Sequence, residues 1–343
     1  MDNTKEKVKK VRSRLPVWAL LVLQLLLTGF VLCVFALFHH VIPRLRLARQ
    51  PGVEPIGVVE RSETPAPAAE PAPVSTEEPA EATPEPWSVR FAEHFSEETV
   101  LDENGYRSPN VSVSITKYSH PDEFPTLTYF VADVYVTDVT FLKTGVPQNS
   151  TFASGEWIAH VNDAVLAING DSMLTSHEGF VIRNGAIYKD TWSSLDFCAL
   201  YYDGTMETFS PQDCSKEDIL AREPYQLWQF GPALLDAEGQ PLEELNVSRE
   251  LRGAHPRTAI GYYEPGHYCF VVVDGRQGNY SAGADIDTLA RLMSSLGCTA
   301  AYNFDGGASS MMVYNEKTIS KPCSKRYISD MLIVTDAPEE GTP

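Results

Sequence analysis

The stretch HPRTAIGYYEPGHYCFVVVDGR, residues 255–276, gives the strongest indication of the fold. Two apolar runs rich in aromatic and β-branched residues flank Pro265-Gly266, a pair typical of tight turns. The pattern predicts an antiparallel hairpin. One strand enters through HPR and the other leaves through DGR, so antiparallel pairing would place Arg257 and Arg276 at the same end.

Other segments extend this pattern. Residues 111–118 alternate as a half-buried strand, 127–136 form a second β-rich run, and 164–168 form a short apolar strand. Asn184-Gly185 and Asp203-Gly204 predict two more hairpins. A further strand ends in YNFDGGASS, residues 302–310.

Helical spacing is less frequent. Residues 286–296 carry one apolar face and are followed by Gly297, a typical C-terminal stop, and residues 155–162 predict a short helix. The expected fold class is α+β, with a mixed, largely antiparallel β-sheet and packed helices in a single globular domain.

The N-terminal part is predicted to be a membrane anchor. Residues 16–38 are apolar apart from Gln24 and Thr28 and are long enough to span a bilayer. Six basic residues precede this segment and three follow it, which favours a cytoplasmic N-terminus and an extracytoplasmic domain in a single-pass cell-membrane protein. The expected organisation is a cytoplasmic basic tail (1–15), a transmembrane helix (16–38), a juxtamembrane and Pro/Glu/Ala-rich linker (39–87), the folded domain (88–336) and a tail (337–343).

Charge narrows the range of partners. Residues 1–50 hold nine of the 27 basic and two of the 46 acidic residues, so the rest carries 18 against 44, a net charge of about −26. Such a surface disfavours sequence-independent binding to nucleic acid or to anionic lipid. Any anionic ligand must therefore be held by local cations.

The cysteines and histidines give no metal signal. No CxxC pair occurs, and five cysteines outside the predicted span leave at least one unpaired. Cys198 and Cys214 flank a hairpin, and the sequence is compatible either with a disulfide between them or with two buried free thiols. His160 and His255 are expected to be structural. The Asp-rich glycine loops are compatible with a structural Ca²⁺, although no EF-hand spacing is present. No cofactor or catalytic metal is expected.

Three polar clusters follow or precede apolar runs and form the predicted site. They are AINGDSM at 167–173, the HPR and DGR ends of the hairpin, and the diglycine segment of YNFDGGASS. Paired guanidiniums match phosphate oxygens, glycine amides approach a ligand closely, and carboxylates perform acid–base work. The expected catalytic residues are Asp305, Asp171 and Asp274, and the expected substrate- or phosphate-binding residues are Arg257, Arg276, Asn169, Gly306, Gly307 and Ser309.

Simpler interpretations compete with each cluster. An isolated NGD or DGR is more often a turn than a site, because Asn, Asp and Gly suit turn geometry. GDSM at 170–173 resembles the GDSL block of serine hydrolases, but no histidine follows His267 to supply the base. The combination of clusters, each with an aspartate, is the stronger signal.

Taken in order, these motifs resemble those of the phosphodiester glycosidase family. The domain of this family is also called the uncovering-enzyme domain, and it resembles N-acetylglucosamine-1-phosphodiester α-N-acetylglucosaminidase. The resemblance rests on NGDSM, GFVIRNG, FGPALL, HPRTAIG, VVVDGRQ and YNFDGGASS, and covers roughly residues 164–335. It implies hydrolysis of a sugar joined through its anomeric carbon to a phosphodiester. Bacterial members are often described as exopolysaccharide-related, which suggests a role in cell-envelope glycan or exopolysaccharide metabolism.

One departure from the family pattern affects the diglycine segment. Ala308 stands where the family usually has a third glycine, and an alanine is tolerated there if its φ is negative. A non-catalytic module that binds envelope glycan or a phosphopolymer, and a purely structural envelope protein, therefore remain alternatives. Retention or inversion depends on the distance between two carboxyls, which the sequence leaves open.

Overall fold

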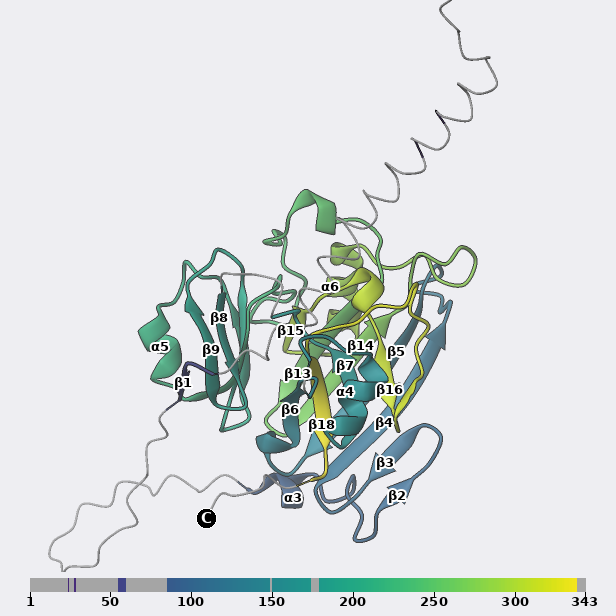
Figure 1. The fold of residues 1–343 in the computed structure, drawn as a ribbon. Coiled ribbons are helices and arrows are strands. Elements are labelled where there is room, and N and C mark those ends of the chain that lie inside the picture. Colours follow the sequence, from purple (N-terminus) through teal and green to yellow (C-terminus); the bar gives the residue numbers. More distant parts are fainter. Residues whose placement is uncertain are drawn as a thin grey trace, which may run out of the picture. The chain divides into compact units, whose positions relative to one another are not determined.

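Three antiparallel sheets make up the folded part of the chain, as a computed structural model shows (Figure 1). The structure describes residues 24, 28, 55–59, 85–148, 150–173 and 179–337. Apart from residues 24 and 28, the predicted transmembrane helix lies outside these residues, as does most of the predicted linker. Within the described ranges, no helix has the length and apolar character that a bilayer crossing requires.

The seven-stranded sheet has the order β15-β13-β14-β5-β4-β3-β2 and contains the predicted hairpin. Arg257 pairs with Val273, so the HPR and DGR ends do lie at the same end of this hairpin. The other end turns at Gly266, whose φ of +89° suits glycine. The strands are β2 (Val100–Leu101), β3 (Gly105–Arg107), β4 (Val111–Ser119), β5 (Thr128–Val136), β13 (Arg257–Glu264), β14 (His267–Val273) and β15 (Ala300–Asn303).

The five-stranded sheet has the order β17-β16-β7-β18-β6 and shares the main apolar core with the seven-stranded sheet. Alternation explains the packing, because Phe130 and Val134 of β5 enter this core while Val131 lies in a second cluster under α6. Strand β7 pairs with both β16 and β18. The strands are β6 (Leu142–Gly145), β7 (Ala164–Asn169), β16 (Met312–Tyr314), β17 (Lys317–Thr318) and β18 (Met331–Thr335).

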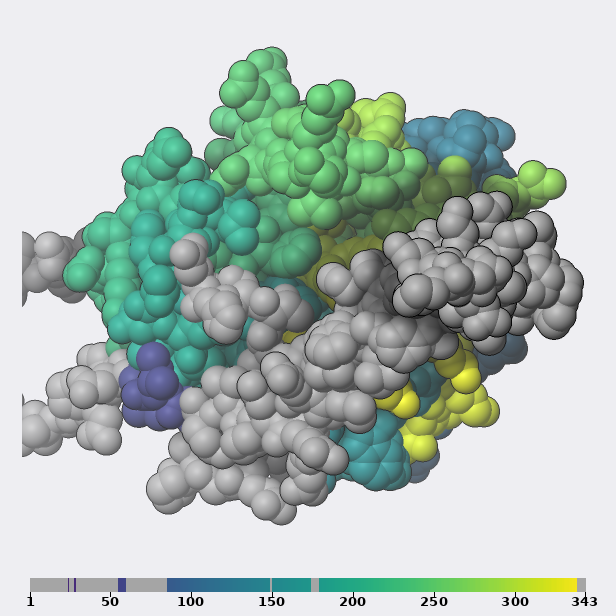
Figure 2. Space-filling view, turned by 45° about the horizontal axis from the view of Figure 1, so that its top comes forward, coloured from purple at the N-terminus to yellow at the C-terminus, as the bar shows by residue number. Residues whose placement is uncertain are grey.

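The six-stranded sheet has the order β1-β9-β8-β12-β10-β11 and contains the two predicted hairpins at Asn184-Gly185 and Asp203-Gly204. Its edge strand β1 lies inside the segment predicted to be a linker, and pairs with Ala186 and Ile187 (purple beside teal in Figure 2). The strands are β1 (Gly57–Val58), β8 (Gly179–Arg183), β9 (Ala186–Thr191), β10 (Phe197–Tyr201), β11 (Met206–Phe209) and β12 (Pro224–Trp228).

Few helices cover these sheets. Helix α6 buries Leu289 and Met293 against the seven-stranded sheet, and its N-cap Asp285 accepts a hydrogen bond from Thr288 N. Helix α4 packs on the five-stranded sheet through Ile158 and Ala159. The helices are α3 (Trp87–Arg90), α4 (Gly155–Val161), α5 (Lys216–Leu220) and α6 (Ile286–Ser295), with 3₁₀ turns η2 (Val139–Phe141), η3 (Arg249–Leu251) and η4 (Gly307–Ser309).

Two expectations about the fold need correction. The predicted mixed sheet is instead three sheets, and every pair of neighbouring strands among the described residues is antiparallel. The predicted linker, residues 39–87, contains a short strand, because β1 pairs with β9. The proline-rich composition of 39–87 hid this short strand, because its two residues carry no periodic signal.

Candidate active site

The three polar clusters meet at one end of β7, β13 and β15. Asp305 N donates to Gly170 O at 3.3 Å, which joins the diglycine segment to the first cluster. Gly307 N donates to Pro256 O at 2.9 Å, which joins it to the hairpin end. These contacts join the three segments into one loop cluster.

Asn169 fastens this cluster together. Its Nδ2 donates to Asp305 O at 2.7 Å, and its Oδ1 accepts from Thr258 Oγ1 at 2.7 Å and Met311 N at 3.1 Å. The side chain is buried. Because protein groups occupy both ends of the amide, Asn169 positions Asp305, and the predicted direct contact with substrate has no open group to make it.

Asp305 is a half-buried carboxyl at the centre of the loop cluster. Burial raises the pKa of Asp305, and the nearby Asp171 adds to this rise, while Ser309, Arg326 and the Gly306 N–H lower it. Gly306 N donates to Asp305 Oδ1 at 2.9 Å. Ser309 acts through proximity, since its buried oxygen makes no hydrogen bond of good geometry to a described residue. A carboxyl with a raised pKa suits general acid–base work near neutral pH.

The two glycines after Asp305 serve close packing. Gly307 has a φ of +64°, and a Cβ on it would lie 3.2 Å from Arg276 Nη1. A Cβ on Gly306 would lie 2.9 Å from Pro256 O. Both glycine N–H groups are engaged inside the protein, so the prediction that they face a ligand as donors is wrong.

Ala308 fits the same turn without strain. It is absent from the described residues with positive φ and lies within the 3₁₀ turn η4. The exchange of the family's usual third glycine for alanine is therefore compatible with this backbone. The hydroxyls of Ser309 and Ser310 are buried beside the turn, and Ser309 lowers the pKa of Asp305.

The two predicted arginines differ in exposure. Arg276 is exposed, and its guanidinium lies over Gly307. Arg257 is 3% exposed and donates to the carbonyl oxygens of Ala284, Leu251 and Gly253 at 3.0, 2.6 and 2.7 Å. Burial lowers the pKa of Arg257 to about 10, and Arg276 lowers it further, against the opposite effect of Asp285. The predicted paired clamp is therefore corrected: Arg257 shapes the loop and Arg276 faces solvent.

Asp274 does not face the loop cluster with its carboxylate. Its two oxygens accept from Lys321 N at 2.9 and 3.1 Å, and Oδ2 also accepts from Tyr280 OH at 2.8 Å. Burial raises the pKa of Asp274, while these hydrogen bonds lower it. Three hydrogen bonds within the protein hold this buried carboxylate, and its catalytic role stays a prediction.

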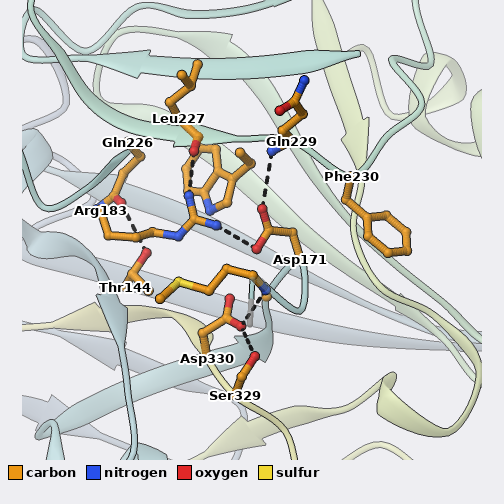
Figure 3. A network of polar contacts seen from close by, with 12 residues as sticks. Thr144, Asp171, Arg183, Gln226, Leu227, Gln229, Phe230, Ser329 and Asp330 are labelled. Atoms are coloured by element: carbon orange, nitrogen blue, oxygen red, sulfur yellow. Dashed lines mark hydrogen bonds and ion pairs between the residues drawn. The ribbon is translucent and has the colours of Figure 1, made fainter. Parts of the chain in front are cut away.

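Asp171 lies deeper than predicted, in a buried ion pair (Figure 3). Its Oδ1 is 2.5 Å from Arg183 Nη2, and its Oδ2 accepts from Gln229 N at 3.2 Å. Arg183 Nη1 donates to Leu227 O at 2.5 Å, which helps to offset the cost of burying the charge. An ion-paired carboxylate that is 1% exposed does not reach a substrate, so Asp171 acts on Asp305 through its field.

Sequence reasoning missed Asp330, which lies beside Asp171. Its Oδ1 accepts from Met173 N at 3.3 Å and from the Ser329 hydroxyl, while its buried Oδ2 has no partner among the described residues. Burial, with the nearby Asp171, raises the pKa of Asp330 to about 7. Gly170 is required here, because a Cβ would collide with Asp330 Oδ2. The sequence feature that could have indicated Asp330 is its position directly before the apolar run MLIV, residues 331–334.

Two hollows among the described residues lie elsewhere. One, of about 410 Å³, is lined by Phe180, Trp192 and the start of α5. The other, of about 400 Å³, lies on the seven-stranded sheet beside Asp133 and His267. Neither includes Asp305 or Arg276. Among the residues with described side chains, no group of three or more His, Cys, Asp or Glu is placed to hold a metal ion.

Comparison with known proteins identifies the family. A sequence model of the family described as phosphodiester glycosidase matches residues 159–335. The SPbeta prophage-derived uncharacterized protein YomE of Bacillus subtilis is 27% identical over 187 residues, which are 52% of this chain and 29% of that protein. The catalytic domain of zebrafish N-acetylglucosamine-1-phosphodiester α-N-acetylglucosaminidase, auto-inhibited by its pro-peptide, superposes with a TM-score of 0.54 and 21% identity over 70% of this chain and 88% of that one. The fold is shared with that enzyme, and the matched segment, about half of the chain, shows that this protein belongs to the phosphodiester glycosidase family.

Proposed function

We propose that this protein hydrolyses the bond between the anomeric carbon of a sugar and a phosphodiester, and that it does so outside the cytoplasm as a membrane-anchored enzyme. The observation that carries the proposal is the loop cluster in which the half-buried Asp305 carboxyl and the exposed Arg276 guanidinium flank one diglycine turn. Family membership supports the reaction class. The predicted anchor at residues 16–38 supports the location.

The chemistry divides between the two sides of the turn. Arg276 faces the phosphodiester and stabilises the charge that grows on the leaving oxygen when the C1–O bond breaks. Asp305 faces the sugar and accepts the proton of the water whose oxygen forms the new bond to C1. A phosphodiester is a weakly basic leaving group, so charge stabilisation matters more here than protonation.

The substrate is proposed to be a glycan of the cell envelope or an exopolysaccharide. A net charge of about −26 outside residues 1–50 repels anionic polymers at long range, so a local cation such as Arg276 must hold the phosphodiester. The predicted anchor would keep the enzyme near envelope glycans. Both points rest on the sequence.

The direct test uses an α-N-acetylglucosamine-1-phosphodiester and the full-length protein. We expect release of free sugar by the wild type and a fall in kcat/KM of roughly 10²- to 10⁴-fold in Asp305→Asn. Asp287→Asn, on the exposed face of α6, is the matched control and should behave as wild type. Undiminished release by Asp305→Asn would disprove the assignment of Asp305.

A binding module without turnover is the second candidate. It is favoured by the internal use of Asp171 and Asp274, two of the three predicted catalytic carboxylates. In that case the protein would bind the phosphodiester without releasing sugar over long incubation. Product formation that depends on Asp305 separates the two candidates.

A further inference from the structure

His255 lies where three backbone segments pack without room for side chains. His255 N donates to Ala284 O at 3.1 Å, and Ala284 N donates back to His255 O at 2.9 Å. A Cβ on Gly275 would lie 2.7 Å from both Gly283 Cα and Pro256 N. The backbone of His255 is thus fixed against the loop that carries Arg276, whose own N donates to Ala282 O at 3.2 Å.

The imidazole of His255 bridges two groups whose hydrogen-bonding roles are fixed. Its Nδ1 is 3.1 Å from Arg276 Nη2, and its Nε2 is 3.3 Å from Glu250 O. A guanidinium only donates and a carbonyl only accepts. Nδ1 therefore accepts and Nε2 carries the hydrogen, which is a neutral tautomer with both ring nitrogens used.

This bridge decides where the Arg276 guanidinium lies. Arg276 is exposed, and an exposed arginine otherwise samples many rotamers. Its φ of +56° sends the side chain back toward the diglycine turn, where Gly307 leaves space for Nη1 and Nη2. The hydrogen bond to Nδ1 holds the guanidinium at that position over Gly307.

We propose that His255, in its neutral Nε2–H form, is a positioning residue that aims Arg276 at the phosphodiester. The identity of the anion rests on the proposed function; the aiming of Arg276 does not. His255 touches no reacting atom in this arrangement. Because His255 already restricts the rotamers of Arg276, less conformational entropy is lost when the substrate binds. His255 therefore acts on substrate affinity more than on the chemical step.

The experiment compares His255→Ala and His255→Asn in the full-length protein. The probes are an α-N-acetylglucosamine-1-phosphodiester for kinetics and dimethyl phosphate, a monoanion, for binding. We expect His255→Ala to raise KM roughly tenfold, the loss expected when a hydrogen bond to a charged group is removed, with a smaller change in kcat. His255→Asn, whose amide oxygen replaces Nδ1 as the acceptor for Arg276, should keep the wild-type KM.

A double-mutant cycle supplies the control for folding. In an Arg276→Ala background, His255→Ala should weaken dimethyl phosphate binding no further, because the residue that it positions is gone. Additive losses, an unchanged KM in His255→Ala, or a KM in His255→Asn as high as in His255→Ala would each overturn the inference. If the wild type releases no sugar, the proposed function fails, while the dimethyl phosphate arms still decide whether His255 positions Arg276.

Discussion

At the scale of the residue, four aspartates near the site have different tasks because their surroundings differ. Asp305 is half-buried and forms no ion pair with a described residue, Asp171 is paired with Arg183, and Asp274 is tied to Lys321 N and Tyr280. Asp330 lies fully buried beside Asp171. Their residue type and strand-end positions could be read from the sequence. Their burial could not, because it depends on partners such as Arg183, which sits inside an ordinary-looking hairpin motif.

Asp330 should make stability fall as pH rises. Its folded-state pKa of about 7 lies above the value of about 3.9 for an unfolded aspartate, so the native state binds more protons between these limits. Unfolding free energy therefore decreases from pH 4 to pH 7, on the order of a few kcal/mol. In Asp330→Asn, which cannot ionise, denaturant unfolding at about pH 5 and about pH 8 should differ less than in the wild type. The same pH slope in both proteins would show that Asp330 is already charged.

Substitutions at Gly307 and Ala308 test whether the turn needs glycine because of its backbone conformation at each position. Gly307→Ala places a methyl group against Arg276 at a φ of +64°, so we expect a loss on the order of 1–2 kcal/mol in stability and a lower kcat/KM. Ala308→Gly, one position later, should change kcat/KM little. Thermal unfolding and steady-state kinetics measure both. Equal tolerance of the two substitutions would contradict the close packing described for this turn.

At the scale of the element, the hairpins and the longer helices were predictable and the sheet order was not. Asn184-Gly185, Asp203-Gly204 and Pro265-Gly266 mark turns whose backbone only a few residues adopt, and the hairpins they predict are present. The division into three sheets depends on contacts between distant strands, such as β7 with β18. Local sequence patterns carry no information about such distant partners. The short strand β1, which pairs with β9, was not predicted for the same reason.

Strand β14 and the turn before β15 place two thiols in reach of each other. Cys269 Sγ and Cys298 Sγ are 3.5 Å apart, and both residues are buried. If the domain faces an oxidising compartment, we expect these cysteines to form a disulfide, which would stabilise the fold by about 3–4 kcal/mol. Intact mass before and after reduction, with Cys269→Ser as control, checks this. Two reactive thiols at these positions after secretion and denaturation without reductant would contradict it.

At the scale of the whole molecule, the proposed extracytoplasmic location rests on the predicted anchor at residues 16–38. The charge asymmetry around residues 16–38 predicts that the full-length protein fractionates with membranes and that its domain is open to protease added outside the cell. A variant that lacks residues 16–38 should leave the membrane fraction. Recovery of the full-length protein in the soluble fraction would contradict the anchored arrangement.

We propose that the phosphodiester binds on the Arg276 guanidinium beside the diglycine turn, with the anomeric carbon facing Asp305. A crystal structure of Asp305→Asn soaked with an α-N-acetylglucosamine-1-phosphodiester tests this arrangement. We predict a phosphate oxygen within hydrogen-bonding distance of the Arg276 guanidinium, near Gly307. Density for the ligand in the hollow at Trp192 or in the hollow at His267, with none at Arg276, would contradict the account.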